Sequence, residues 1–195
     1  MITAVAALGG CCAAASEAQG VRGGLAKTKP VRASRPPARV SRVLTRTQAA
    51  SSVVLYESAQ TGTTKYVVDG RQGRAEVWEG RRISLIQIGR TVYAPKPKRS
   101  CYASAKRSSA LLPNVAGMLL PSGVAALSYK STSRTIKWSI KTSASYQPHG
   151  TVTVSKAGRI VGASIYSGPG VPLTAIVRYP SKAPRIAAPR KLCSK

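Results

Sequence analysis

The residues able to do acid–base chemistry are few in this chain and lie far apart. There is one histidine, His149, and five carboxylate side chains, none of which follows Glu79. General acid–base catalysis needs titratable groups that approach each other, such as a carboxylate pair or a histidine beside an orienting acid. His149 lies in a predicted turn, and no G-x-S-x-G sequence presents a nucleophilic serine. The sequence therefore predicts a protein that is not an enzyme and uses no cofactor.

The four cysteines do not have the spacing of zinc ligands. Two of them, Cys11 and Cys12, lie in an apolar N-terminal segment, whereas Cys101 and Cys193 lie in the body and the C-terminal tail. In an exported protein we expect Cys101 and Cys193 to form a disulfide. Closing a loop of about 90 residues would stabilise the fold by roughly 4 kcal/mol on the chain-entropy account. The alternative is a pair of buried free thiols.

Residues 1–18 resemble the hydrophobic and cleavage regions of a secretory signal peptide. The segment is apolar and too short to span a bilayer. It lacks a basic start, so either the true start lies upstream or the segment is an Ala/Gly-rich terminus. Leu8-Gly9-Gly10-Cys11 resembles a bacterial lipobox, which would make Cys11 a lipidation site. Cleavage after Ala15 or Ala18 competes with lipidation, and either route predicts export.

The charge of the chain predicts an anionic partner. Thirty-one lysines and arginines against five acidic residues give a net charge of +26. Such a domain repels itself and is expected to lie beside anions that screen it. Nucleic acid, anionic lipid headgroups and phosphate-rich wall polymers all qualify.

A nucleic-acid partner is disfavoured by the aromatic pattern. Four aromatic residues in the second half are candidates for base stacking: Tyr129, Trp138, Tyr146 and Tyr166. Ile136, Trp138 and Ile140 alternate with polar residues, however, which is the pattern of a core-facing strand. No helix-turn-helix, zinc-finger or RNP pattern occurs in the sequence. Intracellular nucleic acid is also the wrong partner for an exported chain.

The sequence divides into four parts. Residues 1–18 are the signal-like segment, 19–37 a basic flexible linker, 38–180 a β-rich domain, and 181–195 a basic, proline-rich tail held by Cys193. An amphipathic helix is predicted from Pro36 to about Ala50. Short, regularly spaced strands with turn signals follow, which is typical of an antiparallel meander.

Between Lys106 and Leu120 the apolar residues recur at helical spacing. Pro113 predicts a break into two short helices. The apolar face of these helices is larger than is usual for a short helix on a protein surface. We therefore expect the helices to cover a core or a groove. Strands are again predicted from Val124 to Tyr179.

This order of elements is similar to that of the half-barrel proteins of bacterial envelopes, the LolA and LppX/LprG-like lipoprotein and lipid carriers. Val68-Asp69-Gly70-Arg71 and Ile88-Gly89-Arg90-Thr91 resemble the glycine-turn hairpins of actinobacterial members. The resemblance covers about residues 38–179. It implies an α+β, mostly antiparallel fold in which a curved sheet wraps an apolar groove and short helices cover the concave face.

An apolar cleft of this kind is a usual site for an acyl chain. The candidate groove residues come from the two helices and one strand: Leu111, Leu112, Val115, Met118, Leu119, Ile136, Trp138 and Ile140. We therefore expect an exported, envelope-associated protein that binds a lipid or lipidated ligand without catalysis, and whose basic exterior contacts anionic surfaces. The alternatives are an exported polycationic scaffold for anionic wall polymer and, less favoured, a cytosolic nucleic-acid-binding protein.

Overall fold

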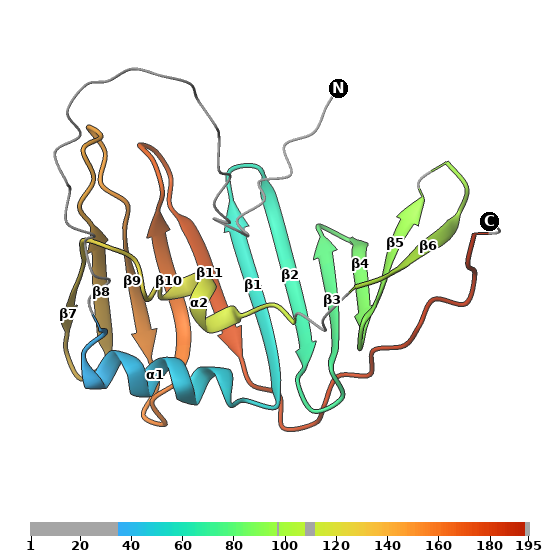
Figure 1. Cartoon of the computed structure of the whole chain (residues 1–195), viewed down its shortest axis with the longest axis horizontal. Coiled ribbons are helices and arrows are strands. Elements are labelled where there is room, and N and C mark those ends of the chain that lie inside the picture. Colours follow the sequence, from blue (N-terminus) through green and yellow to red (C-terminus); the bar gives the residue numbers. More distant parts are fainter. Residues whose placement is uncertain (1–34, 97, 108–111, 194–195) are drawn as a thin grey trace, which may run out of the picture. The chain divides into compact units, whose positions relative to one another are not determined.

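An open sheet of eleven antiparallel strands forms most of the domain, and α1 and α2 lie against one of its faces (Figure 1). The computed structural model describes residues 35–96, 98–107 and 112–193. The α+β half-barrel class predicted from the sequence is confirmed.

The helices are α1 (Ala38–Gln48) and α2 (Val115–Leu119). In the first half of the chain the strands are β1 (Ser52–Ala59), β2 (Gly62–Asp69), β3 (Arg74–Glu79), β4 (Arg82–Ile88), β5 (Thr91–Lys96) and β6 (Cys101–Lys106). In the second half they are β7 (Leu127–Ser131), β8 (Thr135–Ile140), β9 (His149–Val154), β10 (Ile160–Tyr166) and β11 (Leu173–Arg178).

The chain builds the sheet as two meanders that meet at its centre. Strands β1 to β6 pair in sequence order, as do β7 to β11, and β1 pairs with β11 to join the two sets. Antiparallel neighbours need only short turns, and Gly80 (φ 59°) and Gly89 (φ 55°) supply the left-handed backbone at two of them. The segment that includes α2 carries the chain from β6 at one edge of the sheet to β7 at the other.

Helix α1 forms where the sequence predicts it. Pro37 precedes its first turn, and its apolar side chains Val40, Val43 and Leu44 are buried. Its arginines lie on the more exposed side. α1 has eleven residues and α2 has five, and no helix within the described residues is long and apolar enough to cross a bilayer.

The region predicted to form two short helices contains one in its described part. β6 continues to Lys106 because it pairs with β5 along its length, from Cys101–Lys96 to Lys106–Thr91. Helix α2 begins after Asn114, whose side-chain oxygen accepts a hydrogen bond from the Gly117 backbone N–H at 3.0 Å. Residues 108–111, where most of the first predicted helix would lie, are outside the described residues, so that helix stays a prediction.

Two hydrophobic clusters lie on the two faces of the sheet. On the helix-covered face, α1 and α2 pack against β1 and β7 to β11, with Leu55, Ile136 and Ile160 fully buried. On the opposite face, Val67 and Ile86 pack with Ile186, which comes from the C-terminal tail and is 1% exposed. We call this second face the tail-covered face.

The C-terminal tail is attached to the edge of the sheet. The Tyr102 N–H donates to the Lys191 carbonyl at 3.0 Å, and the Cys193 N–H donates to the Tyr102 carbonyl at 3.0 Å. The Arg74 guanidinium donates to the Ile186 carbonyl at 2.9 Å. The predicted disulfide between Cys101 and Cys193 is confirmed. The tail therefore pairs with the outer edge of β6 at Tyr102 and satisfies the backbone groups of that residue.

We predict that replacing both disulfide cysteines (Cys101→Ser with Cys193→Ser) lowers the free energy of unfolding. The two residues are 92 positions apart, so on the chain-entropy account the loss reaches roughly 4 kcal/mol. Urea denaturation of the oxidised protein and of the double variant measures it. An unchanged midpoint would mean that the tail contacts alone hold this edge.

Candidate functional site

An apolar cavity of about 230 Å³ lies where the end of α1 and the start of α2 meet β1 and β2. Val53 and Val68 form its floor on the helix-covered face of the sheet, and Leu112 and Val115 contribute from the α2 segment. Val53 and Val68 are direct cross-strand partners, which brings their side chains to one face. The alternating pattern of the strands thus makes the floor, and tertiary packing of the two helices makes the walls.

Six of the eight predicted groove residues line the apolar cavity or belong to the hydrophobic cluster beside it. Leu112 and Val115 line the apolar cavity. Leu119, Ile136 and Trp138 are buried within the hydrophobic cluster, and Ile140 packs against it.

The two remaining candidates are Met118 and Leu111. Met118 is 39% exposed on α2. Leu111 lies outside the described residues.

Trp138 anchors α2 to the sheet. Its indole N–H donates a hydrogen bond to the Leu119 carbonyl at 3.2 Å, and its side chain is 6% exposed. The ring lies over Gly150, its cross-strand partner, where an added Cβ would come within 2.7 Å of the indole. A buried tryptophan that satisfies its N–H in this way is a core residue that fixes the position of the helix.

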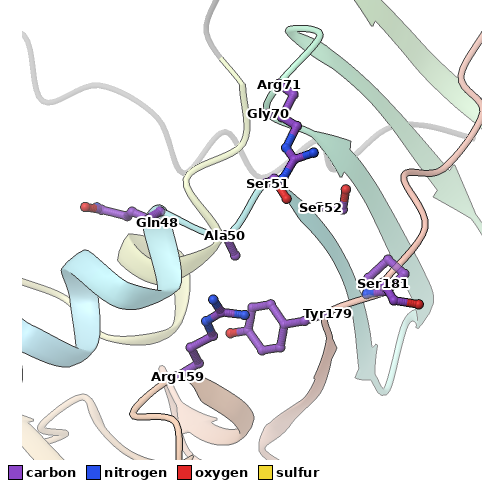
Figure 2. Close-up of a pocket in the computed structure, with 11 residues that line it drawn as sticks. Gln48, Ala50, Ser51, Ser52, Gly70, Arg71, Arg159, Tyr179 and Ser181 are labelled. Carbon is purple, nitrogen blue, oxygen red and sulfur yellow. The ribbon is translucent and has the colours of Figure 1, made fainter.

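A larger, polar cavity of about 670 Å³ adjoins the apolar one, and we call it the polar mouth (Figure 2). Gln48, Ala50 and Gly70 line both cavities. Figure 2 shows Arg159 and Tyr179 on one side of the mouth and Arg71 on the other. An apolar interior therefore opens beside two arginines.

Tyr179 and Arg159 are held together at the mouth. The Arg159 guanidinium lies 5.3 Å from the centroid of the Tyr179 ring, a cation–π distance. The Tyr179 hydroxyl donates to the Ile160 carbonyl. Burial raises the pKa of Tyr179, which keeps this hydroxyl protonated as a donor.

A half-buried carboxylate also faces the helix-covered side. Glu57 lies on β1 two residues after Leu55, whose cross-strand partner is Tyr66. Burial raises the pKa of Glu57, and a hydrogen bond from Tyr66 partly opposes that rise. Burial, together with the nearby Glu57 charge, raises the pKa of Tyr66 to about 12. In the strand register Glu57 lies opposite Thr64, which in turn lies opposite Glu79, so this end of the face is polar.

Within the part of the chain that the structure describes, His149 lies apart from Glu57, the half-buried carboxylate. His149 pairs with Tyr166 across β9 and β10, and the two rings stack with centroids 4.8 Å apart. This places His149 on the tail-covered face, because its neighbour Gly150 faces Trp138 on the helix-covered side. Glu57 therefore lies on the other face of the sheet. Among the described residues, no three histidine, cysteine or carboxylate groups gather as metal ligands.

The four aromatic candidates for base stacking do not all lie on the same face of the sheet. Tyr129 and Trp138 belong to the cluster on the helix-covered face, where the Tyr129 hydroxyl donates to the Pro121 carbonyl. Tyr166 stacks on His149 on the tail-covered face, and the Tyr146 ring lies 6.0 Å from the same histidine. Trp138 and Tyr166 line one cavity of about 580 Å³ together with His149, whereas Tyr129 and Tyr146 do not line it.

Comparison with known proteins identifies the fold. No protein family matches the sequence, and no curated protein shows significant sequence similarity to it. The structure is similar to that of the Mycobacterium tuberculosis lipoprotein LppX, with a TM-score of 0.52 and 10% sequence identity. The match covers 77% of this chain and 97% of that protein. The resemblance to the LolA/LppX-like half-barrel is therefore confirmed at the level of the fold.

Sequence reasoning did not identify the polar mouth. Its residues come from the end of α1, the β2–β3 turn, the start of β10 and the end of β11, which are far apart in the chain. Arg71 and Arg159 look like ordinary turn arginines in a sequence this basic. The only local signal is that each follows a glycine turn, at Gly70 and Gly158.

We predict that Gly150→Ala destabilises the protein by about 1–3 kcal/mol, because its Cβ would meet the Trp138 ring in a packed core. Gly168→Ala is the matched control, since an added Cβ there has no neighbour within 4 Å. Thermal unfolding of the two variants measures the difference. Equal midpoints would contradict the close packing of Trp138 on β9.

We also predict that Glu57→Gln stabilises the protein at neutral pH. The folded-state pKa of Glu57 is raised above 4.5, so its protonated form is the one that folding favours. Stability from this group is present below that ordinary pKa and is lost as pH rises through the folded-state value. The advantage of Glu57→Gln should therefore shrink as the pH falls through the raised folded-state pKa of Glu57, and it should be smallest below about 4.5. Thermal unfolding between pH 3.5 and 7.5 tests this; an advantage that grows toward acid pH would contradict it.

Proposed function

We propose that this protein is an exported, non-catalytic carrier that binds an acyl chain of a lipid or lipidated ligand in the apolar cavity. The observation that carries the proposal is the arrangement of two adjoining spaces, one apolar and one polar, that share Gln48, Ala50 and Gly70. A lipid has the same division between its chain and its headgroup. The fold shared with a bacterial lipoprotein supports the proposal.

The size of the apolar cavity limits what it accepts without rearrangement. About 230 Å³ is below the range of roughly 300–1,000 Å³ that is usual for small-molecule sites. We infer that a segment of one acyl chain enters first, and that a longer ligand separates α2 from the sheet. Leu112, Val115, Leu119 and Trp138 would then become the lining of a deeper groove, with Ile136 and Ile140 beneath them.

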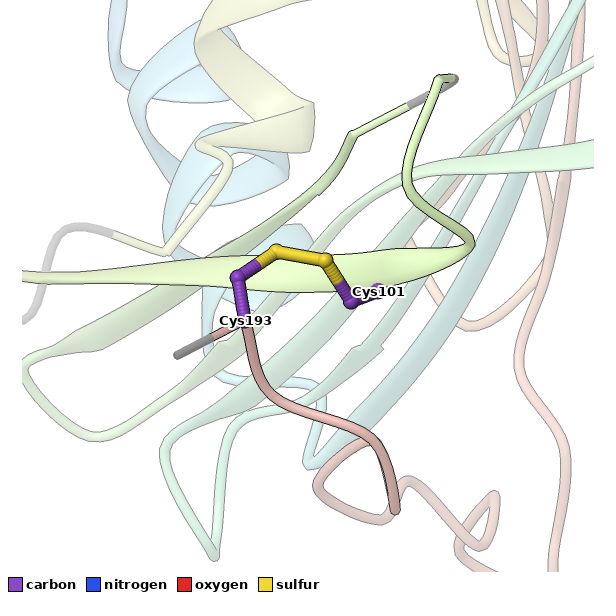
Figure 3. The surroundings of a disulfide bond; sticks show 2 residues. All are labelled: Cys101 and Cys193. Carbon is purple, nitrogen blue, oxygen red and sulfur yellow. A yellow bond between two sulfur atoms is a disulfide. The ribbon is translucent and has the colours of Figure 1, made fainter. Parts of the chain in front are cut away.

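Export is supported by the disulfide between Cys101 and Cys193 (Figure 3). Disulfides form and persist in oxidising compartments such as the bacterial envelope. The signal-like segment that contains Cys11 lies outside the described residues, so lipidation at Cys11 and cleavage after Ala15 or Ala18 remain alternatives of the proposal. We infer an envelope location for the processed chain.

The basic exterior would hold the carrier at an anionic surface. Each lysine or arginine near an anionic membrane contributes roughly 1 kcal/mol of attraction. The net charge of +26, with no carboxylate side chain after Glu79, supplies many such residues. The headgroup at the polar mouth would then face Arg71 and Arg159.

Native mass spectrometry of the protein recovered from the envelope of its host tests the proposal. A processed, oxidised chain that carries a lipid is the expected result. A processed, oxidised chain without lipid would favour the scaffold for wall polymer, and an unprocessed, reduced chain would overturn export.

We predict that Leu112→Gln weakens the binding of a fluorescent fatty acid by about tenfold or more. The substitution places an amide in the apolar cavity and removes an apolar contact worth about 1.5–3 kcal/mol when fully buried. Val171→Gln is the control, because Val171 is 65% exposed and lines neither cavity. Fluorescence titration measures both. Equal affinities for the two variants would place the acyl chain elsewhere.

A further inference from the structure

A third cavity, of about 290 Å³, is lined by cations and lies between α1 and two hairpin turns. Arg39, Arg42 and Arg46 line it from α1, and Lys156 lines it from the β9–β10 turn. The three arginines are spaced at i, i+3 and i+7, which places them along one side of the helix. We call this space the arginine cavity. It shares no lining residue with the apolar cavity or the polar mouth.

Two of the guanidinium groups are fixed in place by backbone carbonyls. Arg39 donates from Nη2 to the Ser133 carbonyl at 2.7 Å, in the β7–β8 turn. Arg46 donates from Nη1 to the Ala157 carbonyl at 3.3 Å, in the β9–β10 turn. Each uses one of its five N–H donors in these contacts, so donors remain for a ligand.

Gly158 makes room for the Arg46 guanidinium. A Cβ at this position would lie 2.6 Å from Arg46 Nη1, and the residue has a left-handed backbone at φ +74°. The turn conformation therefore brings a flat, open stretch of backbone against the guanidinium. Arg46 is thus positioned by the turn and does not simply extend into solvent.

The cations of this cavity have no carboxylate nearby in the sequence or the sheet. The described carboxylates are Glu57, Asp69, Glu76 and Glu79, all on β1 to β3. The cavity is built from α1 and the turns between β7 and β10, which contain none. In addition, the buried Nε of Arg39 has no acceptor among the described residues. A group of four like charges with unsatisfied donors is stabilised when an anion binds it.

We propose that the arginine cavity binds a phosphate group. Planar guanidinium groups pair with phosphate oxygens through two parallel N–H···O bonds, which explains a site built mainly from arginine. A carboxylate can also pair with a guanidinium group through two N–H···O bonds, but a phosphate offers more acceptor oxygens to the four cations that line the cavity. The phosphate belongs either to a lipid headgroup or to a soluble phosphate compound such as a wall polymer.

Isothermal titration with pyrophosphate at low ionic strength tests the site in the full chain. We expect Arg42→Gln with Arg46→Gln to weaken binding at least tenfold, because two charge-assisted hydrogen-bonding groups are lost. The matched control is Arg81→Gln with Arg82→Gln at the β3–β4 turn, which removes the same charge from another exposed site. The control should retain affinity within about twofold. An equal loss in both variants would overturn the site and leave only non-specific attraction.

A charge-preserving variant separates geometry from charge. Arg42→Lys with Arg46→Lys keeps both positive charges but removes the planar guanidinium groups that can donate two parallel hydrogen bonds to a phosphate. We therefore expect several-fold weaker pyrophosphate binding. Thermal unfolding without ligand confirms that each variant is folded. Full affinity in the lysine variant would overturn the proposed guanidinium recognition.

Vesicle sedimentation then identifies the source of the phosphate. Vesicles of phosphatidylcholine with one-quarter phosphatidylglycerol are compared with pure phosphatidylcholine vesicles for the wild type and the Arg42→Gln, Arg46→Gln variant. Loss of anionic vesicle binding in that variant, beyond the loss in the Arg81→Gln, Arg82→Gln control, assigns the cavity to lipid headgroups. Loss of pyrophosphate binding alone assigns it to soluble phosphate.

Discussion

The pairing of β1 with β11 is the interaction on which the rest of this structure depends. It joins a six-stranded and a five-stranded meander into one sheet, from Val54–Arg178 to Ser58–Thr174. Leu55 and Val177 meet in this pairing and are buried beneath the helices. Both the apolar cavity and the polar mouth lie beside this junction, at the start of β1. Since the two strands are more than a hundred residues apart, their pairing closes a long loop, and long-range pairings of this kind slow folding.

Different elements cover the two faces of the sheet. The helices cover one face with apolar side chains and create cavities where their short lengths leave it incompletely filled. The C-terminal tail covers part of the other face with Ile186, and its attachment at Cys193 protects the edge strand β6. A disulfide is useful here because a single buried isoleucine provides only a small hydrophobic contribution, about 1.5–3 kcal/mol.

Charge is distributed in this protein so that its few acids serve local structure. The Asp69 carboxylate accepts the backbone N–H groups of Arg71 and Gln72 in a turn, and Glu76 accepts the Trp78 indole N–H at 3.2 Å. Glu57 lies near Tyr66, and burial together with the Glu57 charge raises the pKa of that tyrosine. The many arginines instead contact carbonyls and aromatic rings, as Arg39 and Arg159 do. Cations that contact carbonyls and aromatic rings are not neutralised by these contacts.

The sequence by itself determined the strands, α1 and the disulfide pair. Period-two alternation, as in Thr135–Ile140, and glycine turns are local signals that hairpins obey directly. The β1–β11 junction, the burial of Ile186 and the three cavities were decided by tertiary structure. Each depends on segments that are distant in the chain, and no local pattern encodes which turn meets which helix. The arginines of α1 illustrate the difference: their spacing is visible in the sequence, but only folding brings them to the Ser133 and Ala157 carbonyls.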